Sequence, residues 1–492
     1  MDNIRYKDLS ADFIKEVFRD VPFKVQPLHH QAVSFIWALD RISNNTMFLH
    51  SVGTGKTFTA LWTAILWGCK KILVVCPASV IVTVWNQQIE EHTDLSATNL
   101  VGKSEERKEL LKQDTDVYVI NYEGLKYLFG RKQTFDGDVK KFIADFGSIP
   151  TLLENFDCLI CDEIHRLKAR NSIQTKLAYR IARHVKNVIM MTGTPIDKTE
   201  LDLWSEYFVL DDGQSLGRSY WRFVDEFFEK IWFNRGRGFF NWKIKANARE
   251  CLLQKLEERT LRYAAHECVD LPEKIYQKRY VQMSKEQQKL YKEVKKGIKT
   301  ETDNQEVKIF ETSAKSHKLL QIPSGFILKE DGSVIKIKGS IPKLEELLNI
   351  LVEIDGQVIV FHRYVEEGRM IESLLKKKKI RFRSARGEIK NKDKQIMDFK
   401  ENESIKVLVA HPVSGGVGQN LQNARAVIFY SNDYSSIVRQ QAEGRIYRFG
   451  QANRCLFIDI LCEGSREEHI YNLLMKGINV SDRILEHLER AG

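Results

Sequence analysis

The sequence has no uninterrupted apolar run approaching the length that crosses a bilayer, and its first residues, MDNIRYKDLSADFIKEVF, lack the basic-then-apolar order of a secretion signal. Only two of its eight cysteines, Cys158 and Cys161, form a C-x-x-C pair, and no second pair at zinc-binding spacing follows. Low-complexity tracts and short internal repeats are also missing. We therefore expect no membrane anchor and a location in the cytoplasm, of a bacterium or a phage-infected cell, or in the nucleus. We expect both paired cysteines to be buried thiols.

What remains is an ordinary globular composition, with 43% hydrophobic and 29% charged residues. The 492 residues suffice for two or three domains with sizeable cores. Lys and Arg exceed Asp and Glu by 76 − 66 = 10, which suits a polyanionic partner but does not establish one.

Short apolar runs alternate with helical patterns in two parts of the chain, which predicts parallel sheets covered by helices on both faces. Between them, from Leu201 to about Ile322, aromatic and charged residues at helical spacing predict a mostly helical insert that includes a helix over 221–232. The fold class we expect is α/β, with two such units in residues 1–270 and 271–492; helical protrusions would begin at about 201 and extend to about 340. The apolar runs are 45–52, 70–77, 116–122, 156–163, 187–195, 357–364, 405–412, 424–433 and 455–462.

The stretch MFLHSVGTGKT, residues 47–57, is typical of a phosphate-binding loop that follows a strand and opens a helix. Gly53, Thr54 and Gly55 would let backbone N–H groups point at phosphate oxygens. Lys56 would neutralise phosphate charge, and the hydroxyl of Thr57 would bind Mg²⁺. The stretch departs from the usual pattern at position 50, where a histidine stands in place of the first glycine, so by itself it also fits an incidental glycine-rich turn.

A second motif supports the nucleotide site. CLICDEIHRLKA places Asp162 and Glu163 at the end of an apolar strand. Asp162 would hold Mg²⁺ and Glu163 would activate the attacking water. An isolated Asp-Glu pair is more often a solvated loop, but here it follows a glycine loop in the order that places both at strand ends, where ligands bind in open α/β sheets.

GTGKT, DEIH and TGTP together resemble motifs of the superfamily-two helicases, and the C-terminal half is similar to the Swi/Snf-type DNA translocases. VSGGVGQNLQNARAVIFYSNDYS and QQAEGRIYRFGQ resemble the fifth and sixth motifs of that family, at its spacing. The resemblance covers the chain from about Pro27 to its end. DEIH replaces the commoner DEAH, and Tyr263 stands where the family often has a second Arg.

The resemblance implies two RecA-like lobes with the ATP site between them. The phosphate loop and the carboxylates would lie on the first lobe, and Arg445 and Arg448 of the second would act as arginine fingers on the transferred phosphoryl group. Outside this motif, both arginines would more often be surface ion-pair residues.

The same resemblance implies roles for four further side chains. The amide of Gln31 would read the adenine edge, since it can both donate and accept hydrogen bonds. Thr192, Thr194 and Gln441 would couple the nucleotide cleft to a DNA track.

The DNA contacts we expect fall into two groups. Ser79, Ser414 and Gly415 would bind phosphates along the track, although Ser79 is equally suited to cap a helix. IWFNRGRGFFNWKI predicts a hairpin with a basic tip, where Arg235 and Arg237 would hold phosphate and Phe239 or its neighbour would stack on an exposed base. The alternative is an ordinary hairpin that packs its tryptophans on the insert helices.

Together these interpretations predict a DNA-dependent ATPase that uses ATP and Mg²⁺, translocates on duplex or branched DNA as a monomer, and serves branch migration or fork remodelling in replication or recombination. Protein partners cannot be read from the sequence. Three alternatives stay open. They are a strand-separating helicase on DNA or RNA, a nucleotide-gated clamp or assembly factor that does not move, and a chromatin remodeller, which accessory domains would favour.

Overall fold

The structure of the chain, a computed structural model, describes residues 6–41, 43–135, 139–193, 199–234, 239–268, 271–301, 316–329, 331–413, 420–448 and 450–491. The chain divides into two compact units. Unit 1 comprises Met1–Asp270 with Asn479–Gly492, and unit 2 comprises Leu271–Ile478.

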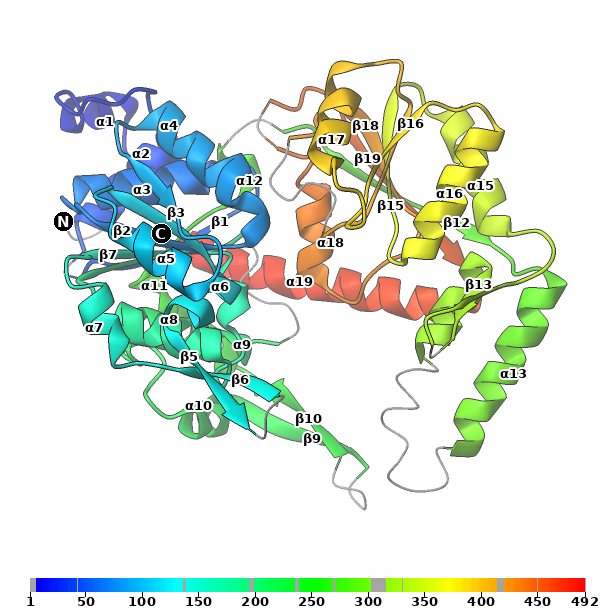
Figure 1. The fold of residues 1–492 in the computed structure, drawn as a ribbon, viewed down its shortest axis with the longest axis horizontal. Helices are drawn as coiled ribbons and strands as arrows, with labels where there is room; N and C mark the ends of the chain where they lie inside the picture. Colours follow the sequence, from blue (N-terminus) through cyan, green and yellow to red (C-terminus); the bar gives the residue numbers. More distant parts are fainter. Residues whose placement is uncertain are drawn as a thin grey trace. The chain divides into compact units, whose positions relative to one another are not determined.

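Unit 1 is built on a seven-stranded sheet in the order β11-β1-β8-β7-β2-β4-β3, in which every pairing is parallel. Figure 1 shows this sheet with β1, β2, β3 and β7 labelled. The central strands are apolar runs buried along their whole length, as expected when helices cover both faces of a parallel sheet. The strands are β1 (Asn45–His50), β2 (Ile72–Cys76), β3 (Ala97–Asn99), β4 (Val117–Asn121), β7 (Cys158–Asp162), β8 (Asn187–Met191) and β11 (Thr260–Tyr263).

The helices of unit 1 pack on both faces of this sheet. On one face, alternate strand residues share a core with α8, α9 and α11, and on the other, α3 contacts β1, β7 and β8. The α-helices are α1 (Ala11–Val17), α2 (His29–Leu39), α3 (Lys56–Leu66), α4 (Gln87–His92), α5 (Ser104–Leu111), α6 (Tyr122–Leu128), α7 (Ser148–Leu152), α8 (Ile173–Ala182), α9 (Asp202–Asp211), α10 (Tyr220–Phe227), α11 (Ala248–Glu257) and α12 (Ala265–Cys268).

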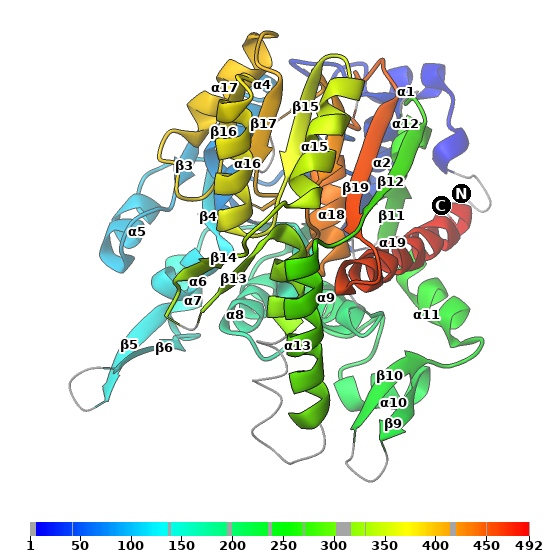
Figure 2. The ribbon, with the colours of Figure 1, turned by 90° about the vertical axis from the view of Figure 1, so that its right-hand side faces the viewer.

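Two antiparallel hairpins extend from unit 1 and take no part in its central sheet (Figure 2). One pairs β5 (Gly130–Phe135) with β6 (Val139–Ala144), and the other pairs β9 (Phe228–Asn234) with β10 (Phe239–Ile244).

Unit 2 is built on a six-stranded sheet in the order β12-β19-β18-β15-β17-β16, again with parallel pairing throughout. Alternate residues of β15 enter two separate cores. Ile359 and Phe361 join one core, and Val358 and Val360 join the other, on the opposite face. The strands are β12 (Lys274–Val281), β15 (Gln357–Phe361), β16 (Phe382–Ala385), β17 (Val407–Ala410), β18 (Ala424–Phe429) and β19 (Cys455–Cys462), beside a small hairpin of β13 (Phe326–Leu328) and β14 (Val334–Lys336). The α-helices are α13 (Lys285–Glu301), α15 (Pro342–Glu353), α16 (Val365–Lys377), α17 (Lys392–Glu401), α18 (Ser436–Glu443) and α19 (Arg466–Ala491), whose residues from Asn479 onward belong to unit 1.

The two parallel sheets with helical cover confirm the expected α/β fold class. Every apolar run predicted as a strand contains one, and Cys158 and Cys161 are both buried in β7. The helix predicted over 221–232 is wrong beyond Phe227, because Phe228 begins β9, whose residues pair across the hairpin with β10. The interval predicted as mostly helical also contains β11 and β12, which add edge strands to the two main sheets.

Among the described helices, none combines the length and the apolar character needed to cross a membrane.

Candidate active site

The predicted phosphate loop runs from the end of β1 into α3. Gly53 and Gly55 have φ angles of 85° and 78°, a left-handed conformation that glycine adopts without steric cost. Gly55 is the N-cap of α3, and no side chain caps this helix. A Cβ on Gly55 would lie 2.4 Å from Gln31 Nε2, so no larger residue fits there without moving Gln31. The turn therefore opens a helix N-terminus that suits an anion.

Side chains hold this loop in place through contacts with its backbone carbonyls. Thr54 Oγ1 donates to the Ser51 carbonyl at 2.9 Å, and Lys56 Nζ donates to the same carbonyl at 3.1 Å. His30 Nε2 lies 2.8 Å from the Thr54 carbonyl, and Gln31 Nε2 donates to it at 3.4 Å. Gln31, predicted to read adenine, lies in the first turn of α2 against this loop, and its Oε1 accepts from the backbone N–H of Leu28, the N-cap of α2.

The candidate carboxylates lie at the end of β7, whose last residue is Asp162, and β7 is separated from β1 only by β8. Asp162 is buried, and its Oδ2 accepts a hydrogen bond from Trp85 Nε1 at 3.1 Å. Tyr122 donates its hydroxyl to the Asp162 carbonyl at 2.7 Å. The sequence reasoning missed both aromatic residues. The signal for Trp85 was weak, since it is one aromatic in the stretch VVCPASVIVTVWNQQI.

Glu163 has a φ of 56°, which is uncommon for a residue with a Cβ. Thr192 Oγ1 donates to Glu163 Oε2 at 3.0 Å, and His165 Nδ1 lies 3.3 Å from the same oxygen. Thr192, a predicted coupling residue, is therefore bonded directly to the predicted catalytic carboxylate.

The segment after β8 also lies close to the phosphate loop. Thr192 N–H donates to the Phe48 carbonyl at 3.2 Å, and a Cβ on Gly193 would lie 3.1 Å from the backbone nitrogen of Val52. The carboxyl-terminal ends of three neighbouring strands, β1, β8 and β7, thus lie together. Thr194, the other predicted coupling residue in this motif, lies outside the described residues.

The two carboxyls differ electrostatically. Burial, together with the charge of Glu163, raises the pKa of Asp162, and the positive charge of Lys56 acts against that rise. Burial would also raise the pKa of Glu163, but His165, Lys56 and the hydroxyl of Thr192 more than offset it and lower that pKa. A nearby cation would therefore stabilise the charged form of Asp162, and Glu163 stays ionised.

His50, at the position of the missing glycine, is completely buried at the end of β1. Burial, with the charges of His30 and Lys56, lowers its pKa well below the usual value, so it is neutral at ordinary pH. Its ring centroid lies 5.5 Å from that of Tyr263, the residue that replaces the family's second arginine. The unusual histidine is therefore a packing residue between β1 and the adjacent strand β11.

In unit 2, the predicted arginine fingers lie in the loop after α18. Arg445 is buried, and its Nη2 donates to the Pro412 carbonyl at 3.3 Å. Burial, with the charge of Arg448 nearby, lowers the pKa of Arg445 to about 10, and burial also lowers the pKa of Arg448. Gln422 Nε2 donates to the Arg448 carbonyl at 3.0 Å, which links the fifth motif to the sixth. Gln441 is half-buried on α18.

Arg439 on the same helix was missed by the sequence reasoning. Its guanidinium donates to both carboxylate oxygens of Asp459, at 2.5 and 2.9 Å, and to Glu443 Oε1 at 2.8 Å. It also lies 3.5 Å from the ring centroid of Phe429. The signal was Asp459 itself, because a charge within the apolar strand CLFIDILC needs a buried partner.

The predicted DNA contacts are only partly described. Ser79 is exposed in a short 3-10 helix, Ala78–Val80, whose N-cap is Pro77, so the alternative that Ser79 is a helix cap is wrong. Ser414, Gly415, Arg235 and Arg237 lie outside the described residues, as does the side chain of Phe239.

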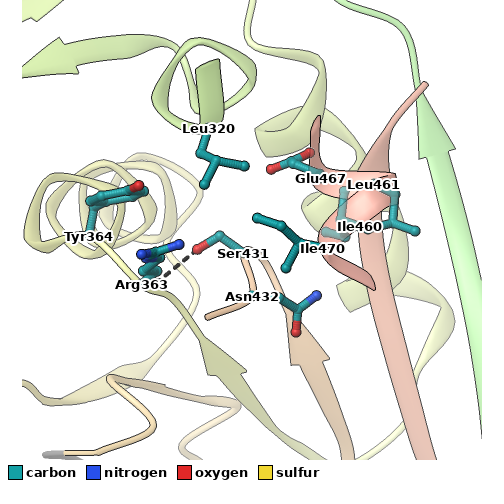
Figure 3. A pocket seen from close by; sticks show the side chains of 9 residues that line it. All are labelled: Leu320, Arg363, Tyr364, Ser431, Asn432, Ile460, Leu461, Glu467 and Ile470. Atoms are coloured by element: carbon teal, nitrogen blue, oxygen red, sulfur yellow. Dashed lines mark hydrogen bonds between the residues drawn. The ribbon is translucent and has the colours of Figure 1, made fainter. Parts of the chain in front are cut away.

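A further pocket of unit 2 is lined by residues of several segments, with Arg363 N–H donating to Ser431 Oγ at 2.8 Å (Figure 3). It leaves only about 10 Å³ for the centre of a water-sized sphere, room for roughly one water molecule. It is therefore a packing gap and not a ligand site.

Comparison with known families matches residues 29–330 to the SNF2-related domain and residues 339–450 to the helicase conserved C-terminal domain. Putative protein p41 of Acyrthosiphon pisum secondary endosymbiont phage 1 is 25% identical over 95% of this chain and 99% of its own length. An uncharacterized ATP-dependent helicase of Mycoplasma genitalium is 27% identical over 89% of this chain but 40% of its own length. Among solved structures, the SWI2/SNF2 ATPase core of Sulfolobus solfataricus in complex with dsDNA is similar, with 22% identity, a TM-score of 0.42, and coverage of 95% of this chain and 94% of that one.

Proposed function

This chain belongs to the SNF2-related family of helicase-like ATPases, and we propose that it hydrolyses ATP in order to move along double-stranded DNA. The observation that carries the proposal is that Lys56, Asp162, Glu163 and Thr192 lie together at the carboxyl-terminal end of the unit 1 sheet. This end of the sheet offers a helix N-terminus for phosphate, two carboxylates in different electrostatic states, and a hydroxyl that orients one of them.

The residues fit ATP and Mg²⁺. The left-handed glycines and the uncapped start of α3 form a cradle in which phosphate oxygens would accept backbone hydrogen bonds, beside the ammonium of Lys56. Thr57, in the first turn of α3, and buried Asp162 would supply the oxygen ligands that Mg²⁺ prefers. When bound, Mg²⁺ neutralises charge on the phosphate oxygens.

In this proposal, Glu163 positions the attacking water. Its lowered pKa keeps it ionised, so it can accept a hydrogen bond from water, and the Thr192 hydroxyl fixes the direction of its carboxylate. The same hydrogen bond joins Thr192 directly to the carboxylate that would hold the attacking water. It is therefore suited to communicate the state of the nucleotide.

We propose that Arg445 and Arg448 complete the site by stabilising the charge of the transferred phosphoryl group. Support comes from the burial of Arg445 and the partial burial of Arg448, since removing a guanidinium from water is costly and a bound phosphate anion would offset that cost. Gln31 would contact the adenine from its position on α2 beside the phosphate loop, and Gln441 would join the coupling residues.

For the substrate, we propose duplex or branched DNA, in a role such as branch migration or fork remodelling during replication or recombination, with the protein acting as a monomer. The net charge of +10 supports a polyanionic track. Exposed Ser79 would contact phosphate there, together with the fifth-motif residues Ser414 and Gly415.

The test is ATP turnover measured with linear duplex, single strand, fork, four-way junction and RNA, for the wild type and Lys56→Ala. We expect duplex and branched DNA to stimulate the wild type, and Lys56→Ala to abolish turnover on every substrate. Stimulation by single strands alone would instead indicate a strand-separating helicase. Failure to displace a third strand from a triplex in an ATP-dependent manner would instead indicate a clamp that does not move.

A further inference from the structure

The β9–β10 hairpin of unit 1 carries one face rich in aromatic residues. The antiparallel register places Phe240 opposite Trp232 and Trp242 opposite Lys230. Because opposed residues and residues two apart share a face, these four side chains lie together and form what we call the aromatic face. The opposite face carries Glu229, Ile231, Asn241 and Lys243.

The side chains of the aromatic face contact one another in a fixed order. The ring centroids of Trp232 and Phe240 are 5.0 Å apart, and those of Phe240 and Trp242 are 5.4 Å apart. Lys230 Nζ lies over all three rings, 4.7 Å from the centroid of Phe240, 5.4 Å from that of Trp242 and 5.8 Å from that of Trp232. Trp242 packs against the core of unit 1 and anchors the row.

The row of rings on the aromatic face is not fully buried. Trp232 is 39% exposed, and Lys230 is exposed beside it. A hairpin that needed its rings only for its own stability would gain by covering the largest of them. Instead the row leaves an indole accessible next to an ammonium, with no carboxylate on the same face.

The charge of the hairpin indicates the kind of ligand. Residues 228–245 contain five Lys and Arg residues and one acidic residue. A strand of nucleic acid presents a phosphate for each base, which suits this excess of positive charge. In a duplex the base faces are covered by their neighbours, so only an unpaired base can stack on Trp232. A protein segment would bury the Lys230 ammonium without necessarily supplying a counter-charge.

We propose that the aromatic face binds single-stranded nucleic acid, with an unpaired base stacked on Trp232 and Lys230 shifted from the rings to a neighbouring phosphate. Base stacking on aromatic side chains is tolerant of sequence, so no base preference is expected. The exchange replaces an exposed cation–π contact by a charge-assisted phosphate contact. This assignment rests on the proposed function, which it deepens by naming the unpaired strand of a branch as a second ligand of the motor.

The test uses the full-length protein without ATP and fluorescence anisotropy of a labelled oligo(dT) of about 20 nucleotides. We expect Trp232→Ala to weaken binding roughly tenfold, the loss typical of one base–aromatic stack. Trp232→Phe keeps a ring and should restore most of the affinity. Lys230→Gln should reduce the slope of log affinity against log salt by about 0.7, the value for one phosphate contact on a single strand.

The matched controls are Ile231→Ala and Asn241→Ala, which remove exposed side chains from the opposite face of the same hairpin. Neither should change oligonucleotide affinity by more than about twofold. Linear duplex should stimulate ATP turnover equally in the wild type and Trp232→Ala, and circular dichroism should show both folded.

Oligonucleotide affinity of Trp232→Ala within twofold of wild type would overturn the assignment and leave the aromatic face to a protein partner. An equal loss in Ile231→Ala would overturn it too, since the effect would then come from hairpin stability. Wild-type protein that binds oligo(dT) through Trp232 but shows no duplex-stimulated turnover would contradict the proposed motor function and not this site.

Discussion

At the scale of single residues, Glu163 holds a left-handed backbone conformation that costs a residue with a Cβ about 1–2 kcal/mol. The contacts made by its carboxylate offset this cost, because the Thr192 hydroxyl donates to it at 3.0 Å and His165 lies 3.3 Å away. Backbone strain that is held by surrounding contacts is concentrated at functional sites. The sequence motif DEIH indicated a carboxylate here but not the backbone angle that directs it.

The role of Glu163 leads to a first prediction. Glu163→Gln keeps the shape and an oxygen for Thr192 but removes the charge that would hold the attacking water. We expect steady-state ATP turnover to fall by roughly 100-fold or more, the range for a positioned acid–base group, while a fluorescent ATP analogue binds as in wild type.

Glu123→Gln is a suitable control, since Glu123 is a half-exposed carboxylate that pairs with Arg166 at 3.2 Å on the surface of unit 1. It should leave turnover unchanged. Turnover of Glu163→Gln within twofold of wild type would assign the chemistry to another group.

At the scale of elements, α18 and β19 are joined by buried charges. Arg439 is 3% exposed, and its partners Asp459 and Glu443 are 1% and 0% exposed. Glu443 also accepts from Lys274 at 3.1 Å and from the Tyr276 hydroxyl at 2.7 Å, which adds β12 to the network. The network holds in place the helix that leads into Arg445 and Arg448.

Removing the arginine from this network gives a second prediction. Arg439→Leu leaves Asp459 buried without its main counter-charge, so we expect unit 2 to lose about 3–5 kcal/mol of unfolding free energy. Urea unfolding followed by circular dichroism measures the loss.

Arg369→Leu provides the contrast. Its ion pair with Glu388, at 3.2 Å, joins two half-exposed side chains, and exposed pairs contribute at most about 1 kcal/mol. Equal destabilisation by the two substitutions would show that burial of the Arg439 network contributes nothing.

At the scale of the whole molecule, the residues proposed to act on ATP belong to two different units of the chain, and this gives a third prediction. Because the phosphate loop belongs to unit 1 and Arg448 to unit 2, Arg448→Ala should leave binding of an ATP analogue within about twofold of wild type. DNA-stimulated turnover should fall by roughly 1,000-fold, the lower end of the range for an arginine finger.

Arg425→Ala removes an exposed arginine from β18 of the same unit and should change neither quantity. If Arg448→Ala abolished binding of the analogue or kept full turnover, it would contradict the proposal that unit 1 binds the nucleotide and Arg448 of unit 2 acts in its hydrolysis.

Much of this protein could be predicted from its sequence, because the physics involved is local. Apolar runs of strand length between helical patterns are enough to specify two parallel sheets, and glycines before a lysine predict the turn that opens α3. The placement of Lys56, Asp162 and Thr192 at strand ends follows from the same patterns, since strands of a parallel sheet end at a common edge.

Other features were decided only by the tertiary structure. Helical spacing predicted one helix over 221–232, but pairing between Trp232 and Phe240 across a hairpin prevails beyond Phe227, because cross-strand contacts depend on residues that the local pattern does not include. Trp85 on Asp162 and Arg439 on Asp459 are contacts over 77 and 20 residues. Their partners are chosen by packing in three dimensions, where a buried polar group must find whichever donor the fold brings to it.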